Sequence, residues 1–253
     1  MIANYHTHTA RCRHAAGTQR QYVESALEAG LQILGFSDHS PYPFPSPYYS
    51  TFRMFPEELE SYVNETLALR REFAAQIAIP LGLEVEYYPK YYPALRSILA
   101  DFPIDYLLLG QHFVGNEIGT HYCGSATADP EILKQYCAQT RDAMQTGDFL
   151  YLAHPDLLKF KGDETLYRRQ MRGLIRDAVA CGLPLELNLL GLRQGRNYPD
   201  LRFWEMAAEE NAALILGTDA HSPQDFLHPT ALPQAKEILK ALSLTPIQTL
   251  RGE

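Results

Sequence analysis

Short apolar segments alternate with longer helical patterns along this chain of 253 residues, and few folds accept such an alternation. The apolar segments are rich in residues that favour β-strands, and they lie near 2–7, 32–37, 77–85, 105–110, 149–153, 184–190 and 213–218. Several are apolar at nearly every position, which is typical of parallel strands that are covered on both faces. Seven strands separated by helices predict an α/β fold, a closed or nearly closed β/α barrel.

The helical patterns between these segments have recognisable ends. Thr18 and Gln21 have the spacing of a capping box, and Gly30 ends the apolar stripe that follows them. Pro56 suits the first turn of a second helix. Further helical patterns cover residues near 130–146, 164–181, 200–211 and 232–242. The alternation continues to both ends of the chain, so we expect a single domain over residues 1–253.

Segment 41–55 interrupts the alternation with four prolines and many aromatic residues. It predicts a loop after the second strand. In a β/α barrel such a loop lies at the C-terminal face of the strands, where active sites are found. A cover over the substrate and a packed surface loop both remain open for this segment.

The composition excludes several classes of protein. Hydrophobic residues make up 46% and charged residues 21% of the chain, as in ordinary globular domains. No apolar run reaches the roughly 18 residues of a membrane span, and the N-terminal residues resemble no secretory signal. The net charge of −8 argues against a nucleic-acid partner, and the four cysteines form no C-x-x-C pair. We therefore expect a cytoplasmic protein with reduced thiols and no membrane partner.

Histidines and carboxylates gather where the predicted strands end. Six of the seven strand ends carry them, and the residues are His6, His8, Asp38, His39, Glu84, Glu86, His112, His154, Asp156, Asp219 and His221. Any one of these histidines alone would more often be a satisfied core residue. Together they face the end of the barrel where catalysis takes place, and burying so many polar groups without a common purpose would be costly.

Imidazole and carboxylate ligands suit zinc, iron or manganese. Residues i and i+2 of a strand point to the same side, so His6 and His8 can bind one ion. Eight or nine ligands are too many for a single tetrahedral ion, which predicts more than one metal. A carboxylate between two sets of histidines would be a natural bridge between metals about 3.5–4 Å apart.

The motifs at these positions resemble the PHP (polymerase and histidinol phosphatase) family. They are YHTHT near the start, FSDHSPYPF, GLEVEYYP, LGQHFVG, LAHPDLLKF, LELNLLGLR and GTDAHSP, and they occur in this order over nearly the whole chain. Within the family, the chain is most similar to the histidinol-phosphate phosphatase branch. Ser222 after the last motif, Lys159 after the H-x-D element and the tail from residue 241 depart from the pattern of the branch, which puts substrate specificity in question.

The resemblance implies a distorted seven-stranded (β/α)7 TIM-like barrel with three divalent metal ions at the C-terminal face of the strands. Mapped onto this sequence, it implies a first metal bound by His6, His8, Glu84 and Asp219. Glu84 would bridge to a second metal bound by His112 and His154, and a third would be bound by His14, His39 and His221. Asp38 and Asp156 are candidates for orienting these histidines through their second ring nitrogen. Glu86 either points to the same side as Glu84 or supports a histidine in the same way.

The reaction implied by the resemblance is hydrolysis of a small phosphate monoester, L-histidinol phosphate, by a hydroxide that bridges two metals. Asp219 and His221 are the candidate catalytic groups for protonating the leaving alkoxide, a role with which their ligation of a metal would compete. Arg193, Lys159 and Arg53 are the candidates for phosphate contact. Two alternatives stay open. One is a phosphoesterase that acts on a nucleotide or another small ester, and the other is a metal-binding module without activity.

Overall fold

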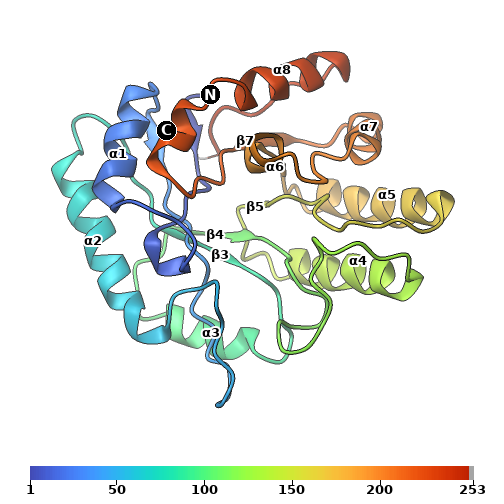
Figure 1. Ribbon diagram of the computed structural model, residues 1–253, viewed down its shortest axis with the longest axis horizontal. Helices are drawn as coiled ribbons and strands as arrows, with labels where there is room; N and C mark the ends of the chain where they lie inside the picture. The colour runs from blue at the N-terminus through green and yellow to red at the C-terminus, as the bar shows by residue number, and fades with distance from the viewer. Residues whose placement is uncertain (251–253) are drawn as a thin grey trace.

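The computed structural model describes residues 1–250, so the last three residues of the predicted domain, 251–253, lie outside the described residues. Figure 1 shows the strands at the centre of the molecule with the helices around them. The strands are β1 Ala3–Asn4, β2 Ile33–Leu34, β3 Gly82–Val85, β4 Tyr106–Leu109, β5 Tyr151–Leu152, β6 Leu185–Asn188 and β7 Leu214–Gly217. All neighbouring strands pair in parallel, which confirms an α/β fold with a parallel sheet.

The strands form two ladders. β1 pairs with β2, and β3 to β7 form a five-stranded sheet in chain order. Single bridges between Thr7 and Ala220 and between His39 and Glu84 lie where the two sheets meet. Near this junction a side chain replaces a backbone partner, because Oδ1 of Asn4 accepts a hydrogen bond from the backbone N–H of Thr218 at 2.7 Å. The largest regular sheet therefore has five strands, whereas the prediction had seven strands in one barrel.

The helices fall close to the predicted ranges. They are α1 Gln19–Glu28, α2 Leu59–Glu72, α3 Tyr92–Leu99, α4 Pro130–Gln145, α5 Glu164–Ala180, α6 Leu189–Gln194, α7 Leu201–Glu209 and α8 Ala231–Ala241. The capping box of Thr18 and Gln21 is present at the start of α1. Short 3-10 turns lie at Ala10–Cys12, Pro56–Glu58 and Pro223–Leu227.

Two helices were not predicted from the pattern. α6 begins inside the apolar segment 184–190, because Asn188 ends β6 and its side chain caps the N–H of Leu190. α3 is only eight residues long and begins next to Pro93, so its pattern is weak. In the described residues, no helix combines the length and the apolar character that crossing a membrane requires.

The outer helices and the strands share one large core. α4 packs against α5, and α5 packs against α7. Every residue of β3, β4, β6 and β7 is buried, as expected for strands covered on both faces. Trp204 of α7 is fully buried beside Phe203. This core holds the strand ends, and the loops after them, in fixed positions.

Replacing Asp163 with alanine should lower the free energy of unfolding by about 1 kcal/mol, because the N-cap of α5 is lost. The side chain of Asp163 accepts a hydrogen bond from the N–H of Leu166 at 2.6 Å. Urea denaturation measures the change. Asp163→Asn, which keeps a capping oxygen, should stay close to the parent protein, and equal losses in both variants would contradict the capping role.

Candidate metal centre

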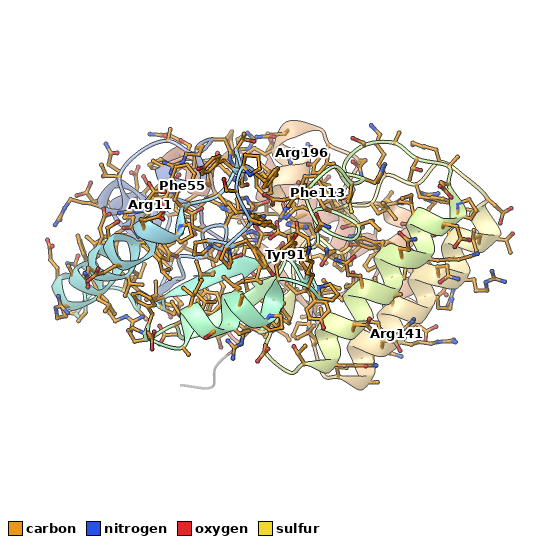
Figure 2. The ribbon with its side chains drawn as sticks, turned by 90° about the horizontal axis from the view of Figure 1, so that it is seen from below. Arg11, Phe55, Tyr91, Phe113, Arg141 and Arg196 are labelled. Atoms are coloured by element: carbon orange, nitrogen blue, oxygen red, sulfur yellow. The ribbon has the colours of Figure 1, made fainter. Side chains whose placement is uncertain are left out.

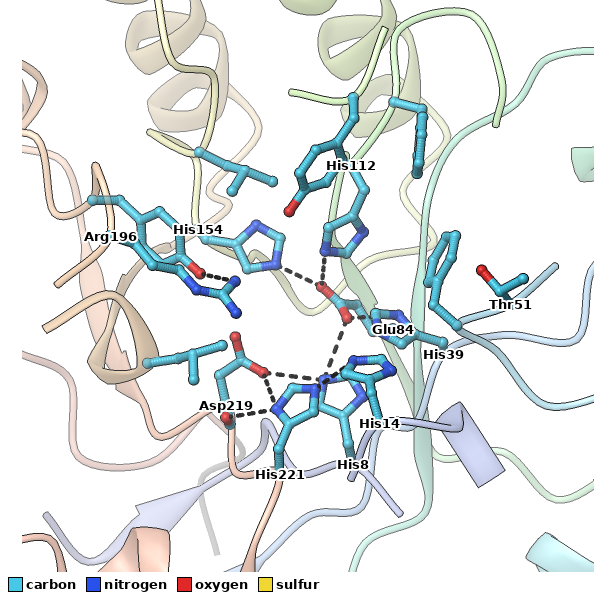
Figure 3. Close-up of a pocket in the computed structure, with 16 residues that line it drawn as sticks. His8, His14, His39, Thr51, Glu84, His112, His154, Arg196, Asp219 and His221 are labelled. Carbon is cyan, nitrogen blue, oxygen red and sulfur yellow. Dashed lines mark hydrogen bonds and ion pairs between the residues drawn. The ribbon is translucent and has the colours of Figure 1, made fainter. Parts of the chain in front are cut away.

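A cavity of about 400 Å³ opens at the C-terminal ends of the strands (Figure 3). Eight of the nine predicted metal ligands line it, namely His8, His14, His39, Glu84, His112, His154, Asp219 and His221. The ninth, His6, lies directly beneath, with its Nε2 3.5 Å from Oε2 of Glu84. Residues separated by more than 200 positions are thus brought together by the parallel arrangement of the strands.

The first predicted ligand set has the geometry of a tetrahedral site. Nε2 of His6 lies 3.5 Å from Oε2 of Glu84 and 3.5 Å from Oδ1 of Asp219. Nε2 of His8 lies 3.5 Å and 3.1 Å from the same two oxygens. Four ligand atoms bound at 2.0–2.1 Å to one tetrahedral zinc ion would lie about 3.3 Å apart. The four distances between these nitrogens and oxygens therefore suit ligands of one metal ion.

The same four atoms lack hydrogen bonds. Nε2 of His6 and of His8, Oε2 of Glu84 and Oδ1 of Asp219 are buried, and within residues 1–250 none of them has a hydrogen-bond partner. Leaving one such buried atom unsatisfied costs about 1–3 kcal/mol. Four of them pointing at one place indicate a site built for a cation.

The second and third sets lie on either side of the first. Oε1 of Glu84 is 2.7 Å from Nε2 of His154 and 3.6 Å from Nε2 of His112, so the two oxygens of Glu84 serve different sets. The third set consists of His14, His39 and His221, and one ligand atom from each lies within 4.8 Å of the others. The three groups predicted from the sequence are therefore adjacent, with Glu84 between the first and the second.

The protonation of the cluster follows from its burial and its charges. Burial would raise the pKa of Glu84, but the imidazoles around it, led by His112, hold that pKa well below the usual range. Burial lowers the pKa of His8, yet Asp219 and Asp38 outweigh it and raise the pKa to about 9. Protons thus balance the carboxylates, and divalent cations would take their place when they bind.

Three carboxylates orient the histidines from behind. Nδ1 of His112 lies 2.9 Å from Oε1 of Glu86, and Nδ1 of His8 lies 3.4 Å from Oδ1 of Asp38, which agrees with the roles predicted for these carboxylates. The third carboxylate, Glu186, was not predicted. Such contacts fix the ring and leave the other nitrogen free for a metal.

Glu186 contacts one residue of the first ligand set and one of the second. Its Oε1 lies 2.8 Å from Nδ1 of His6, and its Oε2 accepts from the backbone N–H of His154 at 3.0 Å. Gly217 on β7 leaves room for this carboxylate, which a Cβ there would overlap. The signal was present in the sequence, since Glu186 and Asn188 of β6 stand two positions apart and therefore point to the same side.

The role predicted for Asp156 is wrong. Its carboxylate accepts from Nε1 of Trp204 at 3.0 Å and from the N–H of Asp200 at 2.6 Å. Burial raises its pKa to about 7. Asp156 therefore supports the start of α7, and no hydrogen bond to a histidine is seen for it among the described residues.

The three residues predicted to contact phosphate do not line the cavity, so the structure does not place them as predicted. The guanidinium of Arg193 donates to the carbonyls of Thr218 and Asp219 and pairs with Asp225. Arg53 is buried beneath the cavity wall, and Lys159 is half-buried outside the lining. Both arginines are occupied by acceptors of the protein itself, which the sequence pattern does not reveal.

Arg196 is the cation that lines the cavity, and it was missed. Its Nη1 donates to the hydroxyl of Tyr198 at 3.1 Å. Figure 2 shows Arg196 and Phe113 near each other on one side of the molecule, while Arg141 of α4 lies toward the opposite side. Thr51, Phe52, Tyr122, Leu157 and Leu190 complete the wall of the cavity.

Comparisons with known proteins agree with this site. A family model described as the PHP domain matches residues 4–189. A protein of Deinococcus radiodurans named "Probable histidinol-phosphatase" is 31% identical over an alignment of 233 residues. The alignment covers 88% of this chain and 87% of that protein. The histidinol-phosphatase of Bacillus subtilis is 26% identical, and its alignment covers 87% of this chain and 93% of the Bacillus protein.

A solved structure has the same fold. The crystal structure of histidinol phosphate phosphatase from Lactococcus lactis, with zinc, L-histidinol and phosphate, aligns with a TM-score of 0.74. The two sequences are 20% identical, and the alignment covers 97% of this chain and 95% of the Lactococcus chain. Because the family model matches well over half of the sequence and the Deinococcus relative extends over most of it, this chain belongs to the PHP family, in its histidinol-phosphatase branch.

Proposed function

We propose that this chain is a metal-dependent phosphomonoester hydrolase that converts L-histidinol phosphate and water to L-histidinol and phosphate, a step of histidine biosynthesis. The observation that supports this most is the meeting of unsatisfied buried nitrogen and oxygen atoms from four ligand side chains at one cavity. The names of the relatives from Deinococcus and Bacillus point to the same substrate.

Three divalent transition-metal ions, zinc, iron or manganese, are part of the proposal. His6, His8, Glu84 and Asp219 would hold the first, Glu84 with His112 and His154 the second, and His14, His39 and His221 the third. Such ions, when bound, lower the pKa of a coordinated water and neutralise phosphoryl oxygens. The seven strands are proposed to form one distorted barrel, and residues 1–253 one domain, that presents this cluster.

The side chains of the protein supply the remaining parts of the mechanism. Arg196 faces the cavity with a permanent positive charge and a planar set of donors, which suits a phosphate dianion. The hydroxyl of Tyr198 accepts from it and fixes its direction. Phe52, Phe113, Leu157 and Leu190 make part of the cavity wall apolar, which strengthens electrostatic interactions of groups bound beside them.

Asp219 and His221 are placed to accept a proton. Burial raises the pKa of Asp219, but the histidines around it outweigh burial and hold the carboxylate ionised. Nδ1 of His221 lies 3.1 Å from the carbonyl oxygen of Asp219, so that nitrogen carries the hydrogen and Nε2 is left unprotonated. In the proposed reaction either group takes the proton of the attacking water and gives it to the departing alkoxide oxygen, or acts as a metal ligand instead.

A substrate panel tests the proposed function. Phosphate release should be measured with histidinol phosphate, nucleoside monophosphates, other small monoesters and single-stranded DNA. We expect kcat/KM for histidinol phosphate to exceed that of every other substrate by about 100-fold or more, as expected where a site is built around one leaving group. Chelator should abolish the release and added metal restore it. Faster hydrolysis of a nucleotide, or activity unaffected by chelator, would overturn the proposal.

The proposal also includes a cytoplasmic location and a small phosphorylated substrate, without a nucleic-acid or membrane partner. The net charge of −8 supports the expectation about nucleic acid.

Replacing Glu186 with glutamine should weaken zinc binding by about 10–100-fold, because carboxylates that orient ligating histidines contribute about that much to metal affinity. The glutamine keeps the size of the side chain but removes the charge next to His6. Competition with a chromophoric chelator measures the affinity. Glu205→Gln on the exposed side of α7 serves as the control, and equal affinities in the two variants would exclude the orienting role.

A further inference from the structure

One buried arginine joins three segments beside the cavity. Arg53 is only 1% exposed. Its Nη1 donates to the carbonyl of Ser40 at 2.8 Å, and its Nη2 donates to Oε1 of Glu86 at 3.1 Å. Its Nε donates to Oε2 of Glu117 at 3.1 Å, an oxygen that Nη2 also contacts. The guanidinium therefore links the segment after β2, the end of β3 and the loop after β4.

Glu86 connects Arg53 to a predicted metal ligand. The oxygen that accepts from Arg53 also lies 2.9 Å from Nδ1 of His112. With a carboxylate at Nδ1, that nitrogen carries the hydrogen and Nε2 is free for a metal. Nε2 of His112 accordingly faces Oε1 of Glu84 at 3.6 Å. The direction of the His112 ring thus depends on a carboxylate that Arg53 holds in place.

Arg53 also supports the wall of the cavity. The ring of Phe52, its neighbour, lies 4.5 Å from the guanidinium carbon, a distance at which a cation and an aromatic face attract. Phe52 stacks on Phe113 at 5.7 Å between ring centres and meets the ring of His39 edge-on at 5.3 Å. Segment 41–55 is therefore joined to the cavity through a fixed aromatic pair.

The charges make this arrangement depend on arginine. Two carboxylates, Glu86 and Glu117, are buried with Arg53 as their shared cation. Tyr48 donates a further hydrogen bond to Glu117 at 3.0 Å. Removing the cation would leave two buried charges unpaired, which is strongly destabilising. A lysine would keep the charge but could not direct planar donors to Ser40, Glu86 and Glu117 at once.

We propose that Arg53 is a positioning residue that sets the direction of His112 for metal binding through Glu86 and holds Phe52 across the cavity. The inference rests on the proposed function in one respect, because it takes His112 to be a metal ligand. Arg53 acts through these two side chains and does not touch the substrate.

Zinc binding tests the first half of the inference. Zinc-loaded full-length protein is titrated with a chromophoric chelator, and the number and affinity of the bound ions are compared for the parent, Arg53→Lys, Glu86→Gln and His112→Ala. We expect Arg53→Lys and Glu86→Gln each to weaken one zinc per chain by about 10–100-fold. His112→Ala should weaken the same ion further.

Arg70→Lys is the matched control. Arg70 also donates to a carbonyl, that of Ile79 at 2.7 Å, and pairs with Asp105, but these residues precede β3 and β4 at the opposite end of the sheet. Its zinc affinities should equal those of the parent. Parent affinity in Arg53→Lys would overturn the inference, even where Glu86→Gln is weakened, while parent affinity in His112→Ala would instead overturn the assignment of His112 as a ligand. Should Arg53→Lys fail to fold, the double variant Arg53→Lys/Glu117→Gln, which removes one of the two buried carboxylate charges, takes its place against Glu117→Gln alone.

Steady-state kinetics test the second half. Glu117→Gln weakens the attachment of the loop after β4 but leaves the contact between Glu86 and His112 in place. We expect KM for histidinol phosphate to rise by about 5-fold or more with kcat and zinc affinity near parent values, since the wall and not the metal site is loosened. An unchanged KM, or a fall confined to kcat, would contradict the role given to Phe52 and segment 41–55.

Discussion

Phosphate release by Glu84→Gln should fall by about 10³-fold or more. Removing a single group that stabilises charge in a transition state already costs about 10²–10³-fold. The carboxylate of Glu84 faces His6 and His8 of the first set and His112 and His154 of the second, and it also contacts His39 of the third. One substitution therefore disturbs all three sets at once. Glutamine has nearly the same size, which keeps steric effects small.

The control for Glu84→Gln is Glu60→Gln at an exposed position of α2, which should keep parental turnover. Circular dichroism and urea denaturation establish whether the Glu84 variant is folded. A folded Glu84→Gln protein with turnover within about 10-fold of the parent would exclude a bridging role for this carboxylate, given the magnitudes above.

Gly110→Ala should lower turnover by about 100-fold. Gly110 follows β4, and a Cβ at this position would overlap Oε1, Cδ and Cγ of Glu84 on the neighbouring strand β3. The carboxylate would have to move, and a displacement of about 1 Å in an active site can cost 10²-fold. Overpacking of this kind also destabilises by about 1–3 kcal/mol.

Gly173→Ala is the matched control. Gly173 lies inside α5, where the nearest atom to an added Cβ would be Nη2 of Arg141 at 3.8 Å, an ordinary contact. This variant should gain up to about 1 kcal/mol of stability from helix propensity and keep its activity. Turnover is compared at a temperature where all the variants are folded. Parental turnover in Gly110→Ala would show that the strand spacing does not hold Glu84 in place.

Much of the metal site could be predicted because its residues stand at the ends of apolar strands. The ends of parallel strands meet at one edge, so His6, Glu84, His112, His154 and Asp219 had to lie close together once the strands were recognised. The helices were also recognisable, since Thr18 and Pro56 mark starts that do not depend on the tertiary fold.

The residues that surround the ligands were less predictable. Whether Arg53 or Arg196 faces the cavity depends on where each loop turns, and the partners of Arg53 lie 13 to 64 positions away along the chain. The spacing of Glu186 and Asn188 places both side chains on one side of β6, but the pairing of Glu186 with His6 is recognisable only after β6 has been placed, because 180 positions separate the two. Long-range pairs of this kind leave no local pattern.

Anomalous diffraction shows without an assay whether the nine predicted ligands bind metal ions in one cavity. Crystals of the protein grown with zinc should show anomalous peaks at the zinc edge among His6, His8, Glu84 and Asp219, between Glu84, His112 and His154, and among His14, His39 and His221. Crystals grown at saturating zinc with no peak in contact with Glu84 would contradict the account.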